Sequence, residues 1–108
     1  MKQLFGQYIK SLRKKNGLTL TQLGAKLGID SANLSKIENG KREFDEKKLE
    51  LLAKTFDLNI EDLKIEFFAE LFAKKLYKNN CSTNAFIVAE EKIKYLKQQD
   101  VKQGKLNL

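Results

Sequence analysis

Apolar side chains recur at three- and four-residue intervals along most of the chain, the spacing that gathers them on one face of an α-helix. The first such stripe comprises Leu4, Phe5, Tyr8, Ile9 and Leu12. Asn16-Gly17 follows it, and glycine readily adopts the left-handed backbone that ends a helix. We therefore predict a first helix over residues 2–15.

Capping residues and the same spacing predict the later helices. Thr19 and Gln22 match a capping box, in which each side chain bonds the other residue's backbone N–H group. Asp30, Asp45 and Asn59 are further N-cap candidates. The predicted helices are Leu20–Leu27, Ser31–Glu38, Glu46–Thr55, a fifth beginning after Asn59, a helical stretch Ile65–Tyr77, and a last helix from about Ser82 to Gln99. Residues 101–108 lack periodicity, and we predict a frayed tail there.

The composition narrows the fold class to all-α. The 108 residues contain no proline, and 42% of them are apolar, enough for one modest core. We expect a first domain over residues 1–64, a helical extension over 65–100 and a flexible tail over 101–108.

Charge is unevenly distributed along the chain. Residues 1–43 contain nine Lys or Arg against three acids (+6), whereas residues 44–108 contain twelve against eleven (+1). A basic front half favours a polyanion such as DNA as the ligand, although a lysine-rich surface also occurs without one.

Several classes of function lack the residues they need. Cys81 is the single cysteine and there is no histidine, so no disulfide, metal-ligand spacing or His-based acid–base pair is present. No nucleophile–base pair or phosphate loop occurs, and we expect neither enzymatic activity nor a cofactor, metal or small-molecule effector. The longest apolar run, 85–89, is too short for a bilayer, and the N-terminus lacks a secretory apolar segment; we expect a cytoplasmic protein.

The segment Leu20–Asn39 combines the features that two short helices joined by a tight turn require. Gly24 is a small residue where the two helices meet, and Gly28 is the glycine at which the turn between them reverses the chain direction. Five apolar residues stand at offsets that attach the pair to the remaining helices: Leu23, Leu27, Ile29, Leu34 and Ile37. The other face of the second helix is mostly polar, and we therefore predict that it points outward.

At these residues the chain resembles the lambda-repressor-like helix-turn-helix family (Cro/CI, or Xre). The similarity runs from about Phe5 to Leu63 and includes LSKIENGKR at Leu34–Arg42. It implies a five-helix domain whose third helix enters the major groove of DNA. Leu20 stands where the family usually has a glutamine that contacts a phosphate and braces the recognition helix. Gln22 is then expected to take over part of that role.

The resemblance also assigns roles to individual residues. It implies base reading by Ser31, Ala32 and Lys36 with Asn33 and Ser35 nearby, phosphate contacts by Asn39, Lys41 and Arg42, and a structural ion pair between Arg13 and Glu38. The chemistry of the residues fits these roles, because a lysine can donate to guanine O6 and N7 whereas an alanine methyl can only contact a thymine methyl. A solvated Lys36 without such a role is the plainer alternative.

The back half of the chain concentrates aromatic residues beyond what a five-helix domain can bury. We expect a homodimer on a pseudo-palindromic operator, because one domain offers few contacts. The expected dimer face comprises Phe67, Phe68, Leu71, Phe72, Leu76 and Tyr77. The alternative is that Phe86, Ile93 and Leu96 cover this face within one chain, and we favour a combination of the two.

Two more specific hypotheses concern the biological role. IEFFAE (65–70) with VAEEKIKYL (88–96) is similar to regulators encoded beside DNA methyltransferases, which suggests an autoregulatory controller of a restriction-modification operon. The rival hypothesis is an antitoxin or other protein-interaction module that also binds its own operator.

Overall fold

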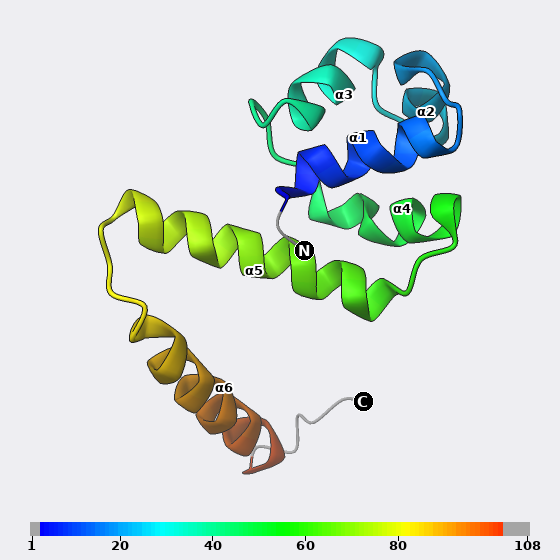
Figure 1. The fold of residues 1–108 in the computed structure, drawn as a ribbon. Coiled ribbons are helices and arrows are strands. Elements are labelled where there is room, and N and C mark those ends of the chain that lie inside the picture. Colours follow the sequence, from blue (N-terminus) through cyan, green and yellow to red (C-terminus); the bar gives the residue numbers. More distant parts are fainter. Residues whose placement is uncertain (1–2, 103–108) are drawn as a thin grey trace. The chain divides into compact units, whose positions relative to one another are not determined.

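The computed structural model describes residues 3–102, and every regular element in that range is helical. In chain order these are α1 (Phe5–Lys15), α2 (Leu20–Leu27), α3 (Ser31–Glu38), a 3-10 turn η1 (Glu46–Lys48), α4 (Leu49–Phe56), α5 (Ile60–Lys78) and α6 (Ala85–Lys102) (Figure 1). The predicted all-α fold is confirmed.

Two elements differ from their predicted bounds in the first half. Helix α1 begins at Phe5, since Gln3 and Leu4 are not helical, and Lys2 lies outside the described residues. The predicted helix 46–55 is divided into η1 and α4, because Asp45 caps only the tight 3-10 turn by accepting the N–H of Lys47 at 3.0 Å.

The second half also departs from prediction. Helix α5 runs unbroken from Ile60 to Lys78 and unites the predicted fifth helix with the predicted helical stretch 65–77. Helix α6 begins three residues later than expected and extends through Lys102, past its predicted end at Gln99; residues 103–108 of the predicted tail lie outside the described range. The structure divides into two compact units, Met1–Leu71 and Phe72–Leu108.

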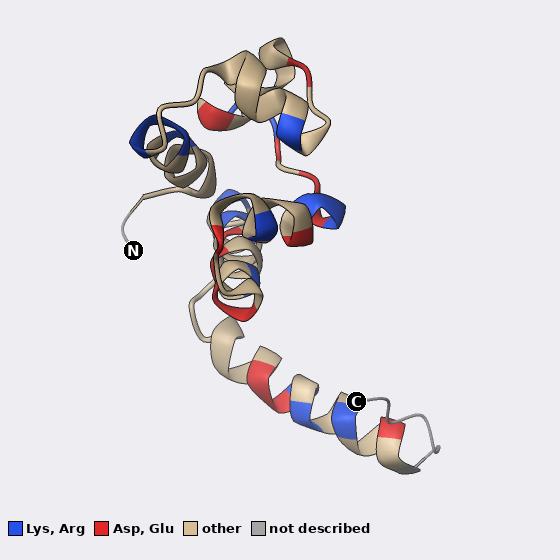
Figure 2. Cartoon of the chain, turned by 90° about the vertical axis from the view of Figure 1, so that its right-hand side faces the viewer, with Lys and Arg blue, Asp and Glu red and all other residues tan. Residues whose placement is uncertain are grey.

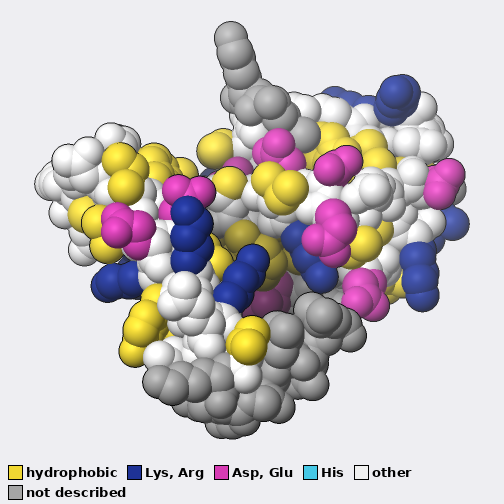
Figure 3. Space-filling model, turned by 90° about the horizontal axis from the view of Figure 1, so that it is seen from below, with side chains coloured by type: hydrophobic (Ala, Val, Ile, Leu, Met, Phe, Trp, Pro, Cys, Tyr) yellow, Lys and Arg dark blue, Asp and Glu magenta, His cyan; other side chains and the backbone are white. Residues whose placement is uncertain are grey.

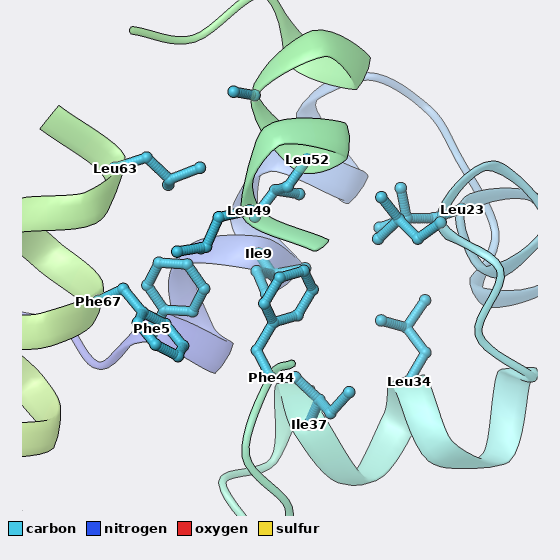
Figure 4. Packing of buried hydrophobic residues seen from close by; sticks show 12 residues of the cluster. Phe5, Ile9, Leu23, Leu34, Ile37, Phe44, Leu49, Leu52, Leu63 and Phe67 are labelled. Atoms are coloured by element: carbon cyan, nitrogen blue, oxygen red, sulfur yellow. The ribbon is translucent and has the colours of Figure 1, made fainter. Parts of the chain in front are cut away.

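The core of the first unit is built around three phenylalanine rings. The centroid of Phe5 lies 5.7 Å from that of Phe44 and 5.3 Å from that of Phe67, in tilted and edge-on arrangements (Figure 4). Aliphatic residues from α1–α5 complete the cluster, with Ile9, Leu23, Leu27, Leu34 and Leu52 fully buried. This core fixes the inner face of α3 against the rest of the unit.

Two glycines allow backbones to approach closely inside this unit. A Cβ atom on Gly6 would lie 2.1 Å from the carbonyl oxygen of Ile37, and one on Gly24 would lie 2.2 Å from that of Ile29. The first contact sets the distance between α1 and α3, and the second sets the corner between α2 and α3. A side chain at either position requires the backbone to move.

Two long-range side-chain bonds tie the helix ends together. The Glu70 carboxylate accepts the backbone N–H of Phe5 at 2.7 Å, which joins α5 to the N-terminus of α1. Lys48 Nζ donates to the Leu27 carbonyl at 2.8 Å and so caps the C-terminus of α2. Both charges have the sign that the helix dipole favours at that end.

The second unit contains the end of α5, the turn 79–84 and α6. The Phe72 and Phe86 rings meet edge-on at 5.2 Å, and Leu76 is buried. Seven large apolar residues of α6 remain exposed: Phe86, Ile87, Val88, Ile93, Tyr95, Leu96 and Val101. Within residues 3–102 no helix has the length and apolar character needed to cross a membrane.

Candidate nucleic-acid interface

Helix α3 divides cleanly into an inner and an outer face. Leu34, Ile37 and Glu38 are buried, and the roughly 100° turn per residue places Ala32 and Lys36 opposite them. Ser31, Ala32 and Lys36 are exposed. The structure therefore leaves all three residues expected to read bases exposed, with Ala32 and Lys36 on the face opposite the core.

The inner face of α3 is anchored by an ion pair. Arg13 Nε donates to Glu38 Oε2 at 2.8 Å and Nη2 donates to Oε1 at 3.1 Å, a two-point arrangement. Arg13 also donates to the Leu18 carbonyl at 2.9 Å, and both side chains are nearly buried. The hydrogen bond to Glu38 raises the pKa of Arg13, and burial opposes this in part.

This pairing affects the charge that α3 presents. Glu38 is the single acid between residues 31 and 42, and its carboxylate faces Arg13 rather than solvent. Lys36, Lys41 and Arg42 are the basic residues of the same segment, and all three are exposed. The outer face of α3 and the following turn are thus positively charged, as a phosphate-facing surface must be.

Asn33 connects the beginning of α3 to Arg42. Its backbone N–H and its Nδ2 atom each donate to the Asp30 carboxylate at 2.8 Å. Its Oδ1 atom accepts from Arg42 Nη1 at 2.9 Å. The side chain is half-buried, so Asn33 lies on the flank of the helix rather than on its outer face.

The C-terminal end of α3 is held by its own side chains and by a glycine turn. Asn39 Nδ2 donates to the Ser35 carbonyl at 2.9 Å and to Ser35 Oγ at 3.4 Å. Gly40 has φ 74°, and the Lys41 N–H donates to the Lys36 carbonyl at 2.8 Å. This helix stop requires a left-handed residue, and Lys41 and Arg42 follow it as exposed residues.

Gln22 lies on α2 and completes the predicted capping box. Its Oε1 atom accepts the Thr19 N–H at 2.9 Å, and its own N–H donates to Thr19 Oγ1 at 3.1 Å. The side chain is exposed, and the two bonds of the capping box do not use its carboxamide nitrogen. That nitrogen is the part of Gln22 that can donate to a phosphate.

The residues expected at the dimer face are distributed between core and surface. Phe67 belongs to the core cluster, Leu71 packs against it, and Leu76 is buried. Phe72 is half-buried, whereas Phe68 is 44% and Tyr77 85% exposed. Of the six, only Phe68 and Tyr77 present a largely exposed side chain.

Sequence reasoning missed three contributions to this site. The Asn33–Arg42 bond spans nine residues, the Lys48 cap spans twenty-one, and the Glu70 bond spans sixty-five. Nothing in local periodicity indicates bonds of this range. The Asp30 cap was found because its partner lies three residues away.

Comparison with known proteins gives related sequences. The helix-turn-helix family matches residues 9–63. The HTH-type transcriptional repressor RghR of Bacillus subtilis (strain 168) is 29% identical over 111 residues, covering 90% of this chain and 82% of RghR. RghRB of the same organism, an uncharacterized HTH-type transcriptional regulator, is 55% identical over 38 residues; that match covers 35% of this chain, and the chain spans about a quarter (27%) of RghRB.

Comparison with solved structures shows the fold in one chain and a further sequence relative in another. A transcriptional regulator from Listeria innocua superposes with a TM-score of 0.52 at 20% identity, covering 92% of this chain and 97% of that one. SinR, a master regulator for biofilm formation crystallised with DNA, is 32% identical with a TM-score of 0.47, covering 54% of this chain and 94% of SinR. The chain belongs to the helix-turn-helix family, of the lambda-repressor-like Cro/CI (Xre) type, and is a transcriptional regulator with a helix-turn-helix DNA-binding domain.

Proposed function

We propose that α3 reads base edges in the major groove through Ser31, Ala32 and Lys36, and that Lys41 and Arg42 hold the flanking phosphates. The observation that carries this proposal is the orientation of α3, whose outer face is polar and basic while its one acid is buried against Arg13. Gln22 and Asn39 are proposed as additional phosphate contacts.

Two lysines make this proposal testable. Lys36→Ala should relax the preference for the base that Lys36 contacts, because it removes a donor to that base edge. Lys41→Ala should weaken binding to all duplexes alike. It should also make the slope of the logarithm of the binding constant against the logarithm of salt concentration shallower by about 0.9, the contribution of one phosphate contact. Selection of bound DNA by each variant, followed by titration at several salt concentrations, measures both effects. Equal binding of the wild type to every duplex would contradict the proposal.

We also propose that two copies bind a pseudo-palindromic operator and that α6 supplies the contact between them. Phe86, Ala89, Ile93 and Leu96 follow each other at alternating steps of three and four, the spacing of a coiled-coil seam. The three large residues among them are exposed in the single chain, and hydrophobic side chains are visible at the surface between charged ones (Figure 3). Such an apolar helix favours a partner surface.

The charges beside this seam favour an antiparallel arrangement. Both signs occur along α6 (Figure 2). Glu90 and Lys97 each follow a seam residue directly, and in an antiparallel pair these flanking positions face each other across the two helices. Two Glu90–Lys97 pairs then form. A parallel pair would instead place Lys92 opposite Lys97, which repel.

A second candidate function is an antitoxin-like role, in which α6 binds a different protein. The exposed apolar residues of α6 favour it as they favour self-association. Purification of the chain alone separates the two, since a dimer formed without another component supports self-association. Both candidates place the protein on DNA, hence in the cytoplasm.

Autoregulation and control of a restriction-modification operon are further parts of the proposal. They rest on the similarity of residues 65–70 and 88–96 to such controllers. Binding of the protein to DNA upstream of its own gene, together with a methyltransferase gene beside it, would support this role, and failure to bind that DNA would exclude it.

A further inference from the structure

We infer that Asn33 is a positioning residue that holds Arg42 for a DNA phosphate, and that it does not read a base. This inference rests on the proposed DNA-binding surface and gives a separate role to Asn33, which the family resemblance places near the base-reading residues. Its basis is the chain of bonds from Asp30 through Asn33 to Arg42.

The chemistry of the three groups fixes the orientation of the Asn33 amide. The Asp30 carboxylate can only accept a hydrogen bond and the Arg42 guanidinium can only donate one. The amide therefore must present its nitrogen to Asp30 and its oxygen to Arg42, as observed at 2.8 Å and 2.9 Å. Rotation of the amide by 180° would oppose donor to donor and acceptor to acceptor.

Base reading would compete with this arrangement. Asparagine recognises adenine by using its amide oxygen and nitrogen together, on N6 and N7. Both atoms of Asn33 already bond to charged protein groups, the Asp30 carboxylate and the Arg42 guanidinium. Asn33 is also half-buried on the flank of α3, whereas Ala32 and Lys36 are exposed on the outer face.

Arg42 gains a fixed position from the same bond. Its side chain is exposed and follows the glycine turn at Gly40, so that without Asn33 it would sample many rotamers. Nη1 is bonded to Asn33, and the remaining donors of the fork can meet a phosphate. Holding the guanidinium beforehand lowers the entropy lost when DNA binds.

The test compares Asn33→Ala, Arg42→Ala and the double variant on selected and random duplexes. Arg42→Ala should reduce the salt slope by about 0.9. Asn33→Ala should weaken binding to all duplexes by about fivefold, the size of one modest hydrogen bond, with the base preference unchanged. In the Arg42→Ala background the Asn33 substitution should have no further effect, because the group it positions is gone.

Two results would overturn the inference. One is a relaxed preference at a single base position in the Asn33→Ala variant. Lys36→Ala is the matched positive control, because it should relax the preference in this way. The other is an Asn33 effect that is absent, or that persists in the Arg42→Ala background. Helix α3 keeps its backbone cap on Asp30 in the variant, and thermal unfolding checks that the fold is intact. Failure of the wild type to select any sequence would count against the proposed function instead.

Discussion

At the scale of single residues, contact distances rather than residue preferences decide the outcome of several substitutions. Gly6 is the clearest case, because its Cα faces the backbone of Ile37 and Glu38 across the α1–α3 contact. Helix propensity alone favours alanine over glycine by up to about 1 kcal/mol. Packing opposes it, since backbone atoms cannot turn aside as a flexible side chain can.

We predict that Gly6→Ala destabilises the protein by about 1–3 kcal/mol, the usual cost of forcing extra volume into a tight contact. Urea unfolding measures the change in the free energy of unfolding. Lys14→Ala, at an exposed position of the same helix, is the control and should change stability little. A Gly6→Ala variant more stable than the wild type would show that α1 and α3 separate easily.

The Arg13–Glu38 pair depends on both partners, because one charge alone would stay nearly buried without compensation. We predict that Arg13→Met costs about 3 kcal/mol, and that adding Glu38→Leu recovers most of the loss, since it removes the stranded charge. Denaturant unfolding of the two variants gives both values. If the double variant were no more stable than the single one, loss of the Arg13 bond to the Leu18 carbonyl would explain the effect instead.

The pH dependence of this pair follows from the raised pKa of Arg13. A cation whose pKa is higher in the folded state contributes stability that is complete below its unfolded pKa and is lost only as pH rises through the folded value. Because the ordinary pKa of arginine is already far above neutral pH and that of Arg13 is raised further, this window lies in strongly alkaline solution. We therefore expect the difference in unfolding free energy between wild type and the double variant to stay constant from pH 7 to about 10.

At the scale of elements, local signals and distant bonds set different properties of a helix. The Thr19–Gln22 box and the Asp30 cap specify where α2 and α3 begin. Both bonds join residues three apart, so they can be predicted from the sequence. The Glu70 bond to Phe5 is of the other kind, and it determines which helix meets the N-terminus of α1.

We predict that Glu70→Ala destabilises the protein by about 1–2 kcal/mol, because the first N–H group of α1 loses a charged acceptor. Faster hydrogen exchange at the Phe5 amide should accompany the loss. Glu61→Ala on the same helix is the control: Glu61 meets Lys64 at 3.8 Å with both side chains exposed, and such a pair contributes less than about 1 kcal/mol. Equal effects of the two substitutions would contradict this role of Glu70.

At the scale of the whole molecule, the exposed apolar residues of α6 are the basis of the proposed dimer. Specific operator binding usually involves two half-sites, and the proposed pairing of α6 would link two reading helices. Any contact between copies raises the local concentration of the second domain at the operator.

We predict that Ile93→Lys converts the dimer to a monomer and weakens operator binding at least tenfold, since a charge enters the seam. Analytical ultracentrifugation and DNA titration measure the two effects. A monomeric wild type, at concentrations where it binds its operator, would refute the α6 contact.

The direction of pairing has its own test. Lys97→Glu should weaken an antiparallel dimer, because it then faces Glu90, whereas it should strengthen a parallel one, because it then faces Lys92. Combining Lys97→Glu with Glu90→Lys should restore the antiparallel dimer. A dimer strengthened by the single substitution would reverse the proposed direction.

The sequence by itself determined the properties that depend on residues close along the chain. Helices α2 and α3 were predicted with their observed bounds, because caps and apolar spacing act within one or two turns. The outward orientation of Lys36 and the inward one of Leu34 followed from the same spacing. The single acid of the α3 segment and its expected partner Arg13 were also visible in the sequence through the family resemblance.

Tertiary structure alone decided which residues far apart in the sequence contact each other. It placed Phe67 in the core beside Phe5, and it joined Asn33 to Arg42 and Glu70 to Phe5. Periodicity cannot distinguish an aromatic residue that packs within the chain from one left for a partner, since both lie on an apolar face. Bonds between residues far apart in sequence depend on how the helices cross, and that geometry exists only once the core has formed.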